Sequence, residues 1–333
     1  MDELIFSNVI SLLGGLALFL FGMGLMGDGL KQAAGDRMET VLSKLTSNPL
    51  KGVLLGTAVT AVIQSSSATS AMVVSFVNAS MMTVRQAIPL VMGANIGTSV
   101  TGWILCLSFL RGSSGIAALL SITNLTAVVA VYGILLRMTA KSPGKVLTGN
   151  IILGFAVLMY GMQIMSAAAA PLRENSGFIG LITMFKNPVL GILIGIAFTA
   201  ILQSNSASVG ILQALSTTGA VTFAAAFPIV MGMGIGAAVP VLLSSVGTNR
   251  DGRRTALIYL CSDLFGTLIW SVVFYTANGF LHFSVMDMTV GPVSIALINT
   301  IFRIASIAVL LPCIRLLEAL VRAVIPDEMQ SIC

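Results

Sequence analysis

The chain has 333 residues, of which 56% are hydrophobic and only 9% are charged, and its mean hydropathy is +1.01. A soluble globular domain carries about 25% charged residues, so this composition excludes an ordinary soluble protein. The net charge of +5 does not indicate nucleic-acid binding, because the basic residues stand singly at the ends of apolar runs without interleaved aromatic residues. We therefore expect an all-helical protein that spans a lipid bilayer several times.

Seven apolar runs each have close to the roughly 20 residues that a helix needs to cross the hydrocarbon layer. The first follows an acidic leader and lacks a small-x-small cleavage site, so we assign it to the mature fold rather than to a signal peptide. The four cysteines are scattered and match no disulfide framework or metal spacing. The expected spans are residues 7–26, 86–110, 113–136, 146–169, 223–248, 254–276 and 291–313.

The sequence repeats itself when it is shifted by 139 residues. "NPLKG" at 48–52 then meets "NPVLG" at 187–191, "TAVIQSSSA" meets "TAILQSNSA", and "PLVMGANIG" at 89–97 meets "PIVMGMGIG" at 228–236. Internal repeats of this length are the usual architecture of secondary transporters.

Residues 49–80 are too long for one perpendicular span, and neither arm of this segment can cross the hydrocarbon layer alone. A re-entrant helical hairpin resolves this, with its polar tip at 64–69 near the midplane. The second half predicts the same hairpin at 188–219, with its tip at 203–208. Irregular backbone at that depth is stable only where it is buried in protein or lines a wet cavity.

A topology with seven spans, two hairpins and the N-terminus outside the cell places thirteen of the 17 basic residues on the cytoplasmic side. Basic residues accumulate on that side of membrane proteins. The C-terminus is then cytoplasmic, and the two repeats have inverted topology. We expect a first repeat at 1–139, a second at 140–290, and a terminal membrane helix with a cytoplasmic tail at 291–333.

The tips offer two kinds of chemistry. Serine hydroxyls and the free N–H groups of a helix start attract anions, whereas hydroxyl, carbonyl and amide oxygens are hard ligands that suit Na⁺. The alternative is structural: Ser and Thr in membrane helices often bond back to the i−4 carbonyl and let helices pack closely. Duplication in register and the Asn-Pro helix starts favour a binding site.

"QSSSATS", "QSNSAS" and "GANIGTSVT" at 93–101 resemble the duplicated signature of the type II sodium-dependent phosphate cotransporter family. The resemblance implies a multi-pass transporter of the cell membrane that takes up inorganic phosphate together with Na⁺, the coupling ion, and needs no other cofactor. We expect the phosphate ligands to be Ser65, Ser66, Ser67, Ser204, Asn205 and Ser206. We expect the sodium ligands to be Gln64, Thr69, Asn95, Thr98, Thr101, Gln203 and Ser208. The resemblance implies these roles for all of them except Asn205, Thr69 and Ser208, which follow from the position of these side chains at the two tips.

This sequence departs from the family pattern in its second half. Asn205 stands where the family has Ser, and "GMGIGAAVP" at 232–240 replaces the Asn-Ile-Gly-Thr-Thr pattern, so Gly234, Ala237 and Ala238 offer no side-chain oxygen. Tyr259 and "SDL" at 262–264 replace a His followed by Phe-Asn. These changes are consistent with one cation site that is weakened or missing. The sequence therefore leaves open the number of coupling ions and the identity of the substrate.

Asp263 and Arg303 carry the charges that fall inside predicted spans. Counted from the ends of two antiparallel helices, both lie about 14 Å above the cytoplasmic surface, so we expect them to pair. A structural lock is the favoured role, because buried ion pairs often serve specificity. The alternatives are a phosphate clamp at Arg303 and a Na⁺ ligand at Asp263.

Other classes of protein fit less well. An intramembrane hydrolase needs a base beside its nucleophile, and no buried His is predicted, so we expect no enzyme. A channel with paired half-helices, a carrier of another small anion such as sulfate or a carboxylate, and a transport-altered relative remain as alternatives. The sequence leaves the oligomeric state open, a homodimer included.

Overall fold

The computed structural model of the chain describes residues 2–35, 48–109 and 122–327. This part is almost entirely helical, with one isolated antiparallel bridge between Thr222 and Thr289. The main helices are α1 (Asp2–Ala34), α3 (Pro49–Ile63), α4 (Ser66–Asn78), α5 (Val84–Cys106), α7 (Ile122–Thr139), α8 (Pro143–Ala169), α9 (Ser176–Met184), α10 (Pro188–Leu202), α11 (Asn205–Ser216), α12 (Phe223–Gly236), α13 (Ala238–Ser244), α14 (Arg250–Leu281), α15 (Pro292–Leu310) and α16 (Ile314–Val324).

Six helical segments of the described residues are long and apolar enough to cross a membrane, which confirms the expected class of all-helical membrane protein. They are Ser7–Ala34, Val84–Phe109, Pro143–Glu174, Phe223–Ser244, Arg250–Leu281 and Pro292–Val324. The seventh predicted span, 113–136, overlaps α7, and its first part lies outside the described residues.

Two elements differ from the expectation. A short apolar helix, α9, precedes α10 and meets it at 103°. The bend lies at Asn187-Pro188, where the Asn187 side chain accepts hydrogen bonds from the first N–H groups of α10 and Pro188 cannot extend a preceding helix. The expected cytoplasmic tail also begins as a helix, α16, whose Ile314, Leu317 and Val321 are buried at helical spacing.

Helix boundaries recur at the spacing of the sequence repeat. The helices α3 and α10 begin at 49 and 188, α4 and α11 at 66 and 205, and α5 and α12 at 84 and 223. The repeat fails near the end of the third pair, where α5 continues but α12 stops at Gly236. Pro240 explains this difference, because it has no N–H to donate to the Gly236 carbonyl, whereas the first half has Thr101 there.

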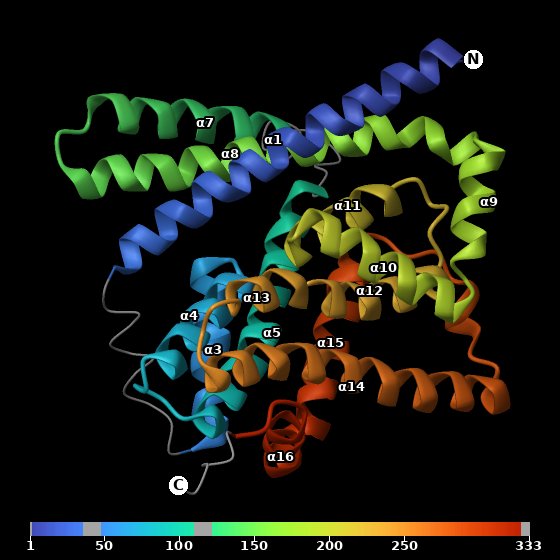
Figure 1. Cartoon of the computed structure of the whole chain (residues 1–333). Coiled ribbons are helices and arrows are strands. Elements are labelled where there is room, and N and C mark those ends of the chain that lie inside the picture. Colours follow the sequence, from blue (N-terminus) through green and yellow to red (C-terminus); the bar gives the residue numbers. More distant parts are fainter. Residues whose placement is uncertain (1, 36–47, 110–121, 328–333) are drawn as a thin grey trace, which may run out of the picture.

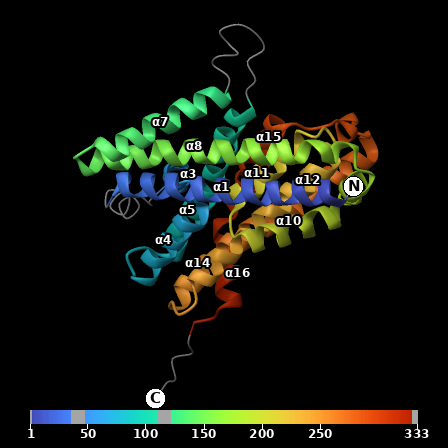
Figure 2. The ribbon, with the colours of Figure 1, turned by 90° about the horizontal axis from the view of Figure 1, so that it is seen from above.

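In each repeat the first helix packs closely against the third. The helices α3 and α5 pack together, as do α10 and α12, and a Cβ at Gly56 or Gly195 would collide with the carbonyl oxygen of Leu90 or Ile229 on the facing helix. The helices α1, α7 and α8 lie together along one side of the remaining helices (Figures 1 and 2). One face of α1 in this layer lies toward the break between α3 and α4 and toward the break between α10 and α11.

Candidate functional site

Each candidate tip begins with a glutamine in the left-handed backbone region. Gln64 has φ 61° and ψ 21°, and Gln203 has φ 54° and ψ 21°. Only a few per cent of residues other than Gly have positive φ. Both glutamine N–H groups still bond to the preceding turn, at 2.7 Å to the Thr60 oxygen and 2.8 Å to the Thr199 oxygen. The two helices therefore end in the same way, and the chain turns sharply in both.

The next helix starts on a serine in both tips. Ser65 and Ser204 have extended backbones, and each side-chain oxygen accepts a hydrogen bond of 3.2 Å from the N–H group three residues later. This is N-cap geometry, which leaves the two N–H groups between the cap and its partner without an intrahelical acceptor. Each tip therefore presents free backbone donors, a serine hydroxyl and the positive end of a helix dipole.

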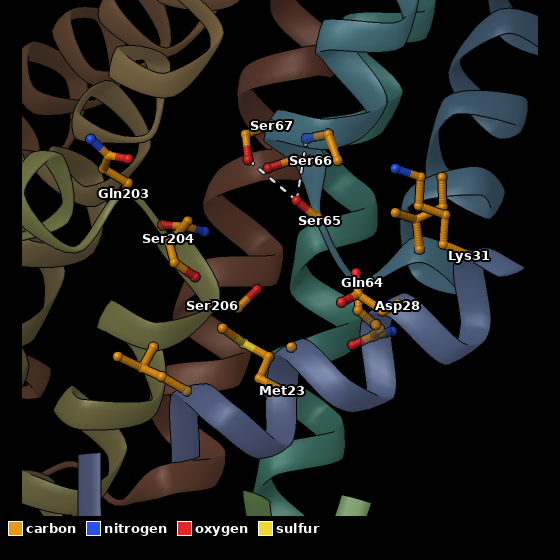
Figure 3. A pocket seen from close by; sticks show the side chains of 16 residues that line it. Met23, Asp28, Lys31, Gln64, Ser65, Ser66, Ser67, Gln203, Ser204 and Ser206 are labelled. Atoms are coloured by element: carbon orange, nitrogen blue, oxygen red, sulfur yellow. Dashed lines mark hydrogen bonds between the residues drawn. The ribbon is translucent and has the colours of Figure 1, made fainter. Parts of the chain in front are cut away.

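Both tips line one cavity of about 280 Å³ (Figure 3). Its third wall is one face of α1, formed by Leu20, Met23, Gly24, Gly27, Asp28 and Lys31. The tip residues that line it are Ile63, Gln64, Ser65, Ser66, Ser67, Ala68, Gln203, Ser204, Asn205 and Ser206. Two segments 139 residues apart in the sequence therefore share one polar space.

Two buried amides in the cavity wall lack partners. Asn205 is 5% exposed, and neither its Oδ1 nor its Nδ2 has a hydrogen-bond partner among the described residues. Gln64 donates from Nε2 to the Ala61 carbonyl, but its buried Oε1 has no partner in the same part of the chain. A buried polar group without a partner costs about 1–3 kcal/mol, so a polar ligand in the cavity would offset this penalty.

The remaining predicted ligands lie outside the cavity wall. The hydroxyls of Thr69 and Ser208 donate to the carbonyls of Ser65 and Ser204, at 3.0 and 3.1 Å, and so stabilise the first turn of α4 and of α11. The Thr98 hydroxyl bonds to the Ala94 carbonyl at 3.2 Å. The Thr101 hydroxyl is buried and has no partner among the described residues.

Asn95 belongs to a separate buried cluster. Its Nδ2 donates to Asp263 Oδ2 at 3.2 Å, and Arg303 Nη1 lies 3.4 Å from Asp263 Oδ1. Arg303 also donates from Nε to Asn299 Oδ1 at 3.1 Å. The helices α5, α14 and α15 thus meet at an ion pair whose two side chains are almost completely buried.

Tyr259 links this cluster to the first tip. Its hydroxyl lies 3.2 Å from the Ser66 hydroxyl, and one helical turn later α14 carries Asp263. The tyrosine side chain is fully buried. Ser66 therefore has a fixed partner within the fold, whereas Asn205 at the matching position of the second tip has none among the described residues.

The charged residues Asp28 and Lys31 were not among the predicted ligands. They sit near the end of the first span, and the charge count placed Lys31 in a cytoplasmic connection. A signal was present in the sequence, because positions 20, 23, 24, 27, 28 and 31 follow helical spacing and so share one face of α1. The sequence does not show that this face of α1 points toward the two tips, because that depends on tertiary packing.

Comparison with known proteins gives the family. The Na⁺/Pi-cotransporter family matches residues 18–167 and 176–299. The chain is 27% identical to "Uncharacterized protein YqeW" of Bacillus subtilis over 96% of this chain and 99% of that protein. It is 26% identical to "Putative inorganic phosphate export protein YjbB" of Escherichia coli over 79% of this chain, and this match spans 46% of the relative.

A third relative matches a shorter region more strongly. "Sodium-dependent phosphate transport protein 2B" of Homo sapiens is 41% identical over 102 residues, which is 30% of this chain and 15% of that protein. No solved structure matches the chain. The family match covers more than half of the chain, so the protein belongs to the Na⁺/Pi-cotransporter family.

Proposed function

We propose that the protein is a Na⁺-coupled carrier of inorganic phosphate that binds its substrate between the two tips. The observation that carries this proposal is the shared cavity, in which both tips place hydroxyls, free helix-start N–H groups and unpartnered buried amides around one space. Ligand pockets have volumes of roughly 300–1,000 Å³, so a cavity of about 280 Å³ lies near the lower end of this range and has room for a small ion.

The hydrogen-bond donors that line this cavity support the proposal that it binds phosphate. The residues proposed to hold the anion are Ser65, Ser66, Ser67, Ser204, Asn205 and Ser206. Two helix starts that point at one space add their dipoles, which stabilises a negative charge there. The α1 wall carries the positive charge of Lys31 and the negative charge of Asp28, so the donors of the two tips supply the net attraction for an anion.

Sodium binding is proposed at oxygen atoms close to the same tips. Gln64 and Gln203 line the cavity and carry amide oxygens, which are hard ligands. The Thr69 hydroxyl keeps its lone pairs after it donates to the turn below. The Ser208 oxygen donates in the same way but also accepts a hydrogen bond of 2.9 Å from the Thr199 hydroxyl, so it keeps one lone pair. Asn95, Thr98 and Thr101 complete the proposed set on α5. A cation there would offset part of the cost of a multivalent anion inside the membrane.

The transport cycle is proposed to be alternating access. In this arrangement 1–139 and 140–290 are inverted repeats, 49–80 and 188–219 are re-entrant hairpins that reach the midplane from opposite sides, and the N-terminus is outside. Motion of the hairpin-bearing core against the other helices then exposes the cavity to each side in turn. A carrier of this kind runs in either direction, which accommodates relatives named for export and for sodium-dependent transport.

Uptake by proteoliposomes tests the proposal. Purified protein should accumulate radiolabelled phosphate under an inward Na⁺ gradient but not under an equal K⁺ gradient, with saturation at high phosphate. Ser65→Ala should abolish most of this uptake. Ser75→Ala is the matched control, because Ser75 lies on the exposed face of α4 and bonds only to the Ala71 carbonyl among the described residues.

The same vesicles separate the alternatives. Sulfate or a carboxylate taken up in place of phosphate would identify a carrier of a different anion. A phosphate conductance that needs no Na⁺ gradient would identify a channel. Absence of all uptake from folded protein would contradict the proposed function.

A further inference from the structure

The two repeats differ at the end of their third helix. Asn95, Thr98 and Thr101 of α5 carry side-chain oxygens, whereas the residues 139 positions later are Gly234, Ala237 and Pro240. The first half therefore has three additional oxygen ligands for a cation, and the second half has none at these positions. Something else occupies the space that a side chain at position 234 would need.

That space holds the carboxylate of Asp263. A Cβ added at Gly234 would lie 3.0 Å from Asp263 Oδ1, closer than nine in ten real Cβ contacts. Asn95 donates to the other oxygen of the same carboxylate, at 3.2 Å. Asp263 thus lies between two positions that correspond to each other in the repeats, and Gly234 makes the room for it.

Arg303 supplies a positive charge to this carboxylate from α15. Its Nη1 lies 3.4 Å from Asp263 Oδ1, and its side chain is 1% exposed. Within the described part of the chain, Arg303 Nη2, Asn95 Oδ1 and Asn299 Nδ2 are buried without hydrogen-bond partners. The carboxylate of Asp263 and the amide oxygens of Asn95 and Asn299 are the kind of ligands that bind a cation. In this protein the guanidinium of Arg303 lies among them.

We propose that Arg303 is a tethered cation that takes the place of a bound Na⁺ in the second repeat. The inference rests on the proposed function, because it states how many coupling ions that carrier uses. The guanidinium neutralises Asp263 permanently and does not move with substrate, so this half of the protein contributes no Na⁺ through Asp263. Na⁺ coupling then depends on the tips and on the oxygens of α5.

Removal of the tethered charge should open the site to a free ion. In Arg303→Gln the carboxylate of Asp263 is left with the amide of Asn95 and with space where the guanidinium was. A buried unpaired carboxylate is strongly destabilising, and a Na⁺ ion would relieve this. We expect the purified variant to gain a Na⁺-specific rise in Tm of at least about 2 °C over an equal concentration of choline.

The matched control is Asp263→Asn/Arg303→Gln, which removes both charges. Its response to Na⁺ should equal that of the unmodified protein, because Asp263 binds no Na⁺ when Arg303 is present. Arg303→Lys retains a tethered cation and should also gain no response. Binding is read from Tm in detergent, so the result does not depend on whether the protein transports phosphate.

Two results would overturn the inference. A folded Arg303→Gln whose Tm responds to Na⁺ as the unmodified protein does would mean that Asp263 forms no cation site. A double variant that responds less than the unmodified protein would make Asp263 a Na⁺ ligand in the presence of Arg303, and this comparison stands even where Arg303→Gln alone does not fold. If the Na⁺ response appears in Arg303→Gln but no variant transports phosphate, the proposed function fails and the cation site remains.

Discussion

The hydroxyl of Ser66 in the first tip lies 3.2 Å from the hydroxyl of Tyr259, which is fully buried on α14. The repeat register pairs Ser66 with Asn205 and pairs Tyr259 with Leu120, which has no hydroxyl to offer. The two tips therefore share their backbone geometry but differ in how one polar side chain is held. The first tip is fixed to α14, and the second keeps an unpartnered amide at the cavity among the described residues.

Tyr259→Phe should loosen the first tip. The change leaves the buried Ser66 hydroxyl without its partner, and the expected loss of stability is about 1–2 kcal/mol. Thermal unfolding of the purified variant measures this. Tyr275→Phe is the control, because the buried Tyr275 hydroxyl has no partner among the described residues and its removal should cost little. Equal losses in both variants would contradict the role given to the Ser66–Tyr259 contact.

Gly56→Ala and Gly195→Ala should each destabilise the protein by about 1–3 kcal/mol, because a methyl group at either position collides with a backbone carbonyl of the facing helix. Gly14→Ala serves as the control, since nothing described lies within 4 Å of a Cβ there and alanine favours a helix. Midpoints of thermal unfolding rank the three variants. A Gly56→Ala protein as stable as Gly14→Ala would contradict the close packing of α3 and α5.

Lys31→Gln should raise the KM for phosphate several-fold and leave thermal stability unchanged, because Lys31 is an exposed residue that lines the cavity. Lys51→Gln removes the same charge from an exposed position of α3 outside the cavity, so its KM should stay unchanged. Initial rates of phosphate uptake measure both. A similar rise in KM for the two variants would indicate a general effect of net charge rather than a contact in the cavity.

The segment after α16 is attached to α14 through Arg254, whose side chain is 2% exposed. Arg254 donates to the Ile325 carbonyl from Nε at 2.9 Å and to Asp327 Oδ1 from Nη2 at 2.6 Å. The Arg254 guanidinium lowers the pKa of the Asp327 carboxyl below its ordinary value. Asp327 therefore binds a proton more weakly in the folded protein than in the unfolded chain.

The Asp327 carboxylate therefore stabilises the folded protein fully at a pH above the ordinary pKa of an aspartate. This stabilisation is lost as the pH falls through the lowered pKa of Asp327 in the folded protein. The difference in Tm between the unmodified protein and Asp327→Asn should be largest at neutral pH and should shrink at acid pH. Asp287→Asn is the control, since Asp287 is exposed and lies 3.7 Å from Lys186 in a surface pair that contributes little. A difference that is independent of pH would contradict the assigned pairing.

Much of the fold could be predicted from the sequence because membrane burial leaves strong patterns. Long apolar runs gave the spans, and the repeat placed both helix breaks, since Asn-Pro caps and polar Gln-Ser steps recur at the same spacing. The helix α9 was missed because its nine residues are too few for a membrane span and lie before Asn187-Pro188, where the predicted hairpin begins. The break before α13 was missed because Pro240 lies within an otherwise uniform apolar stretch.

The candidate site could be predicted only in part. The tips were visible as sequence motifs, but the approach of α1 depends on tertiary packing, so Asp28 and Lys31 were not connected with the cavity. The contacts of Ser66 with Tyr259 and of Asn95 with Asp263 join residues 193 and 168 positions apart. No local pattern encodes such distances. The proximity of Asp263 and Arg303 could be predicted because helical rise fixes depth in two antiparallel spans.

The central claim is that both tips contact one phosphate ion, and protection of introduced cysteines tests it most directly. Ser67→Cys and Ser206→Cys are prepared in a protein whose four native cysteines are replaced by alanine, with Ser75→Cys as the exposed control. Phosphate together with Na⁺ should slow modification by a charged thiol reagent at positions 67 and 206 and leave position 75 unaffected. In variants that still accumulate phosphate, protection at only one tip, or at neither, would contradict a single site shared by the two.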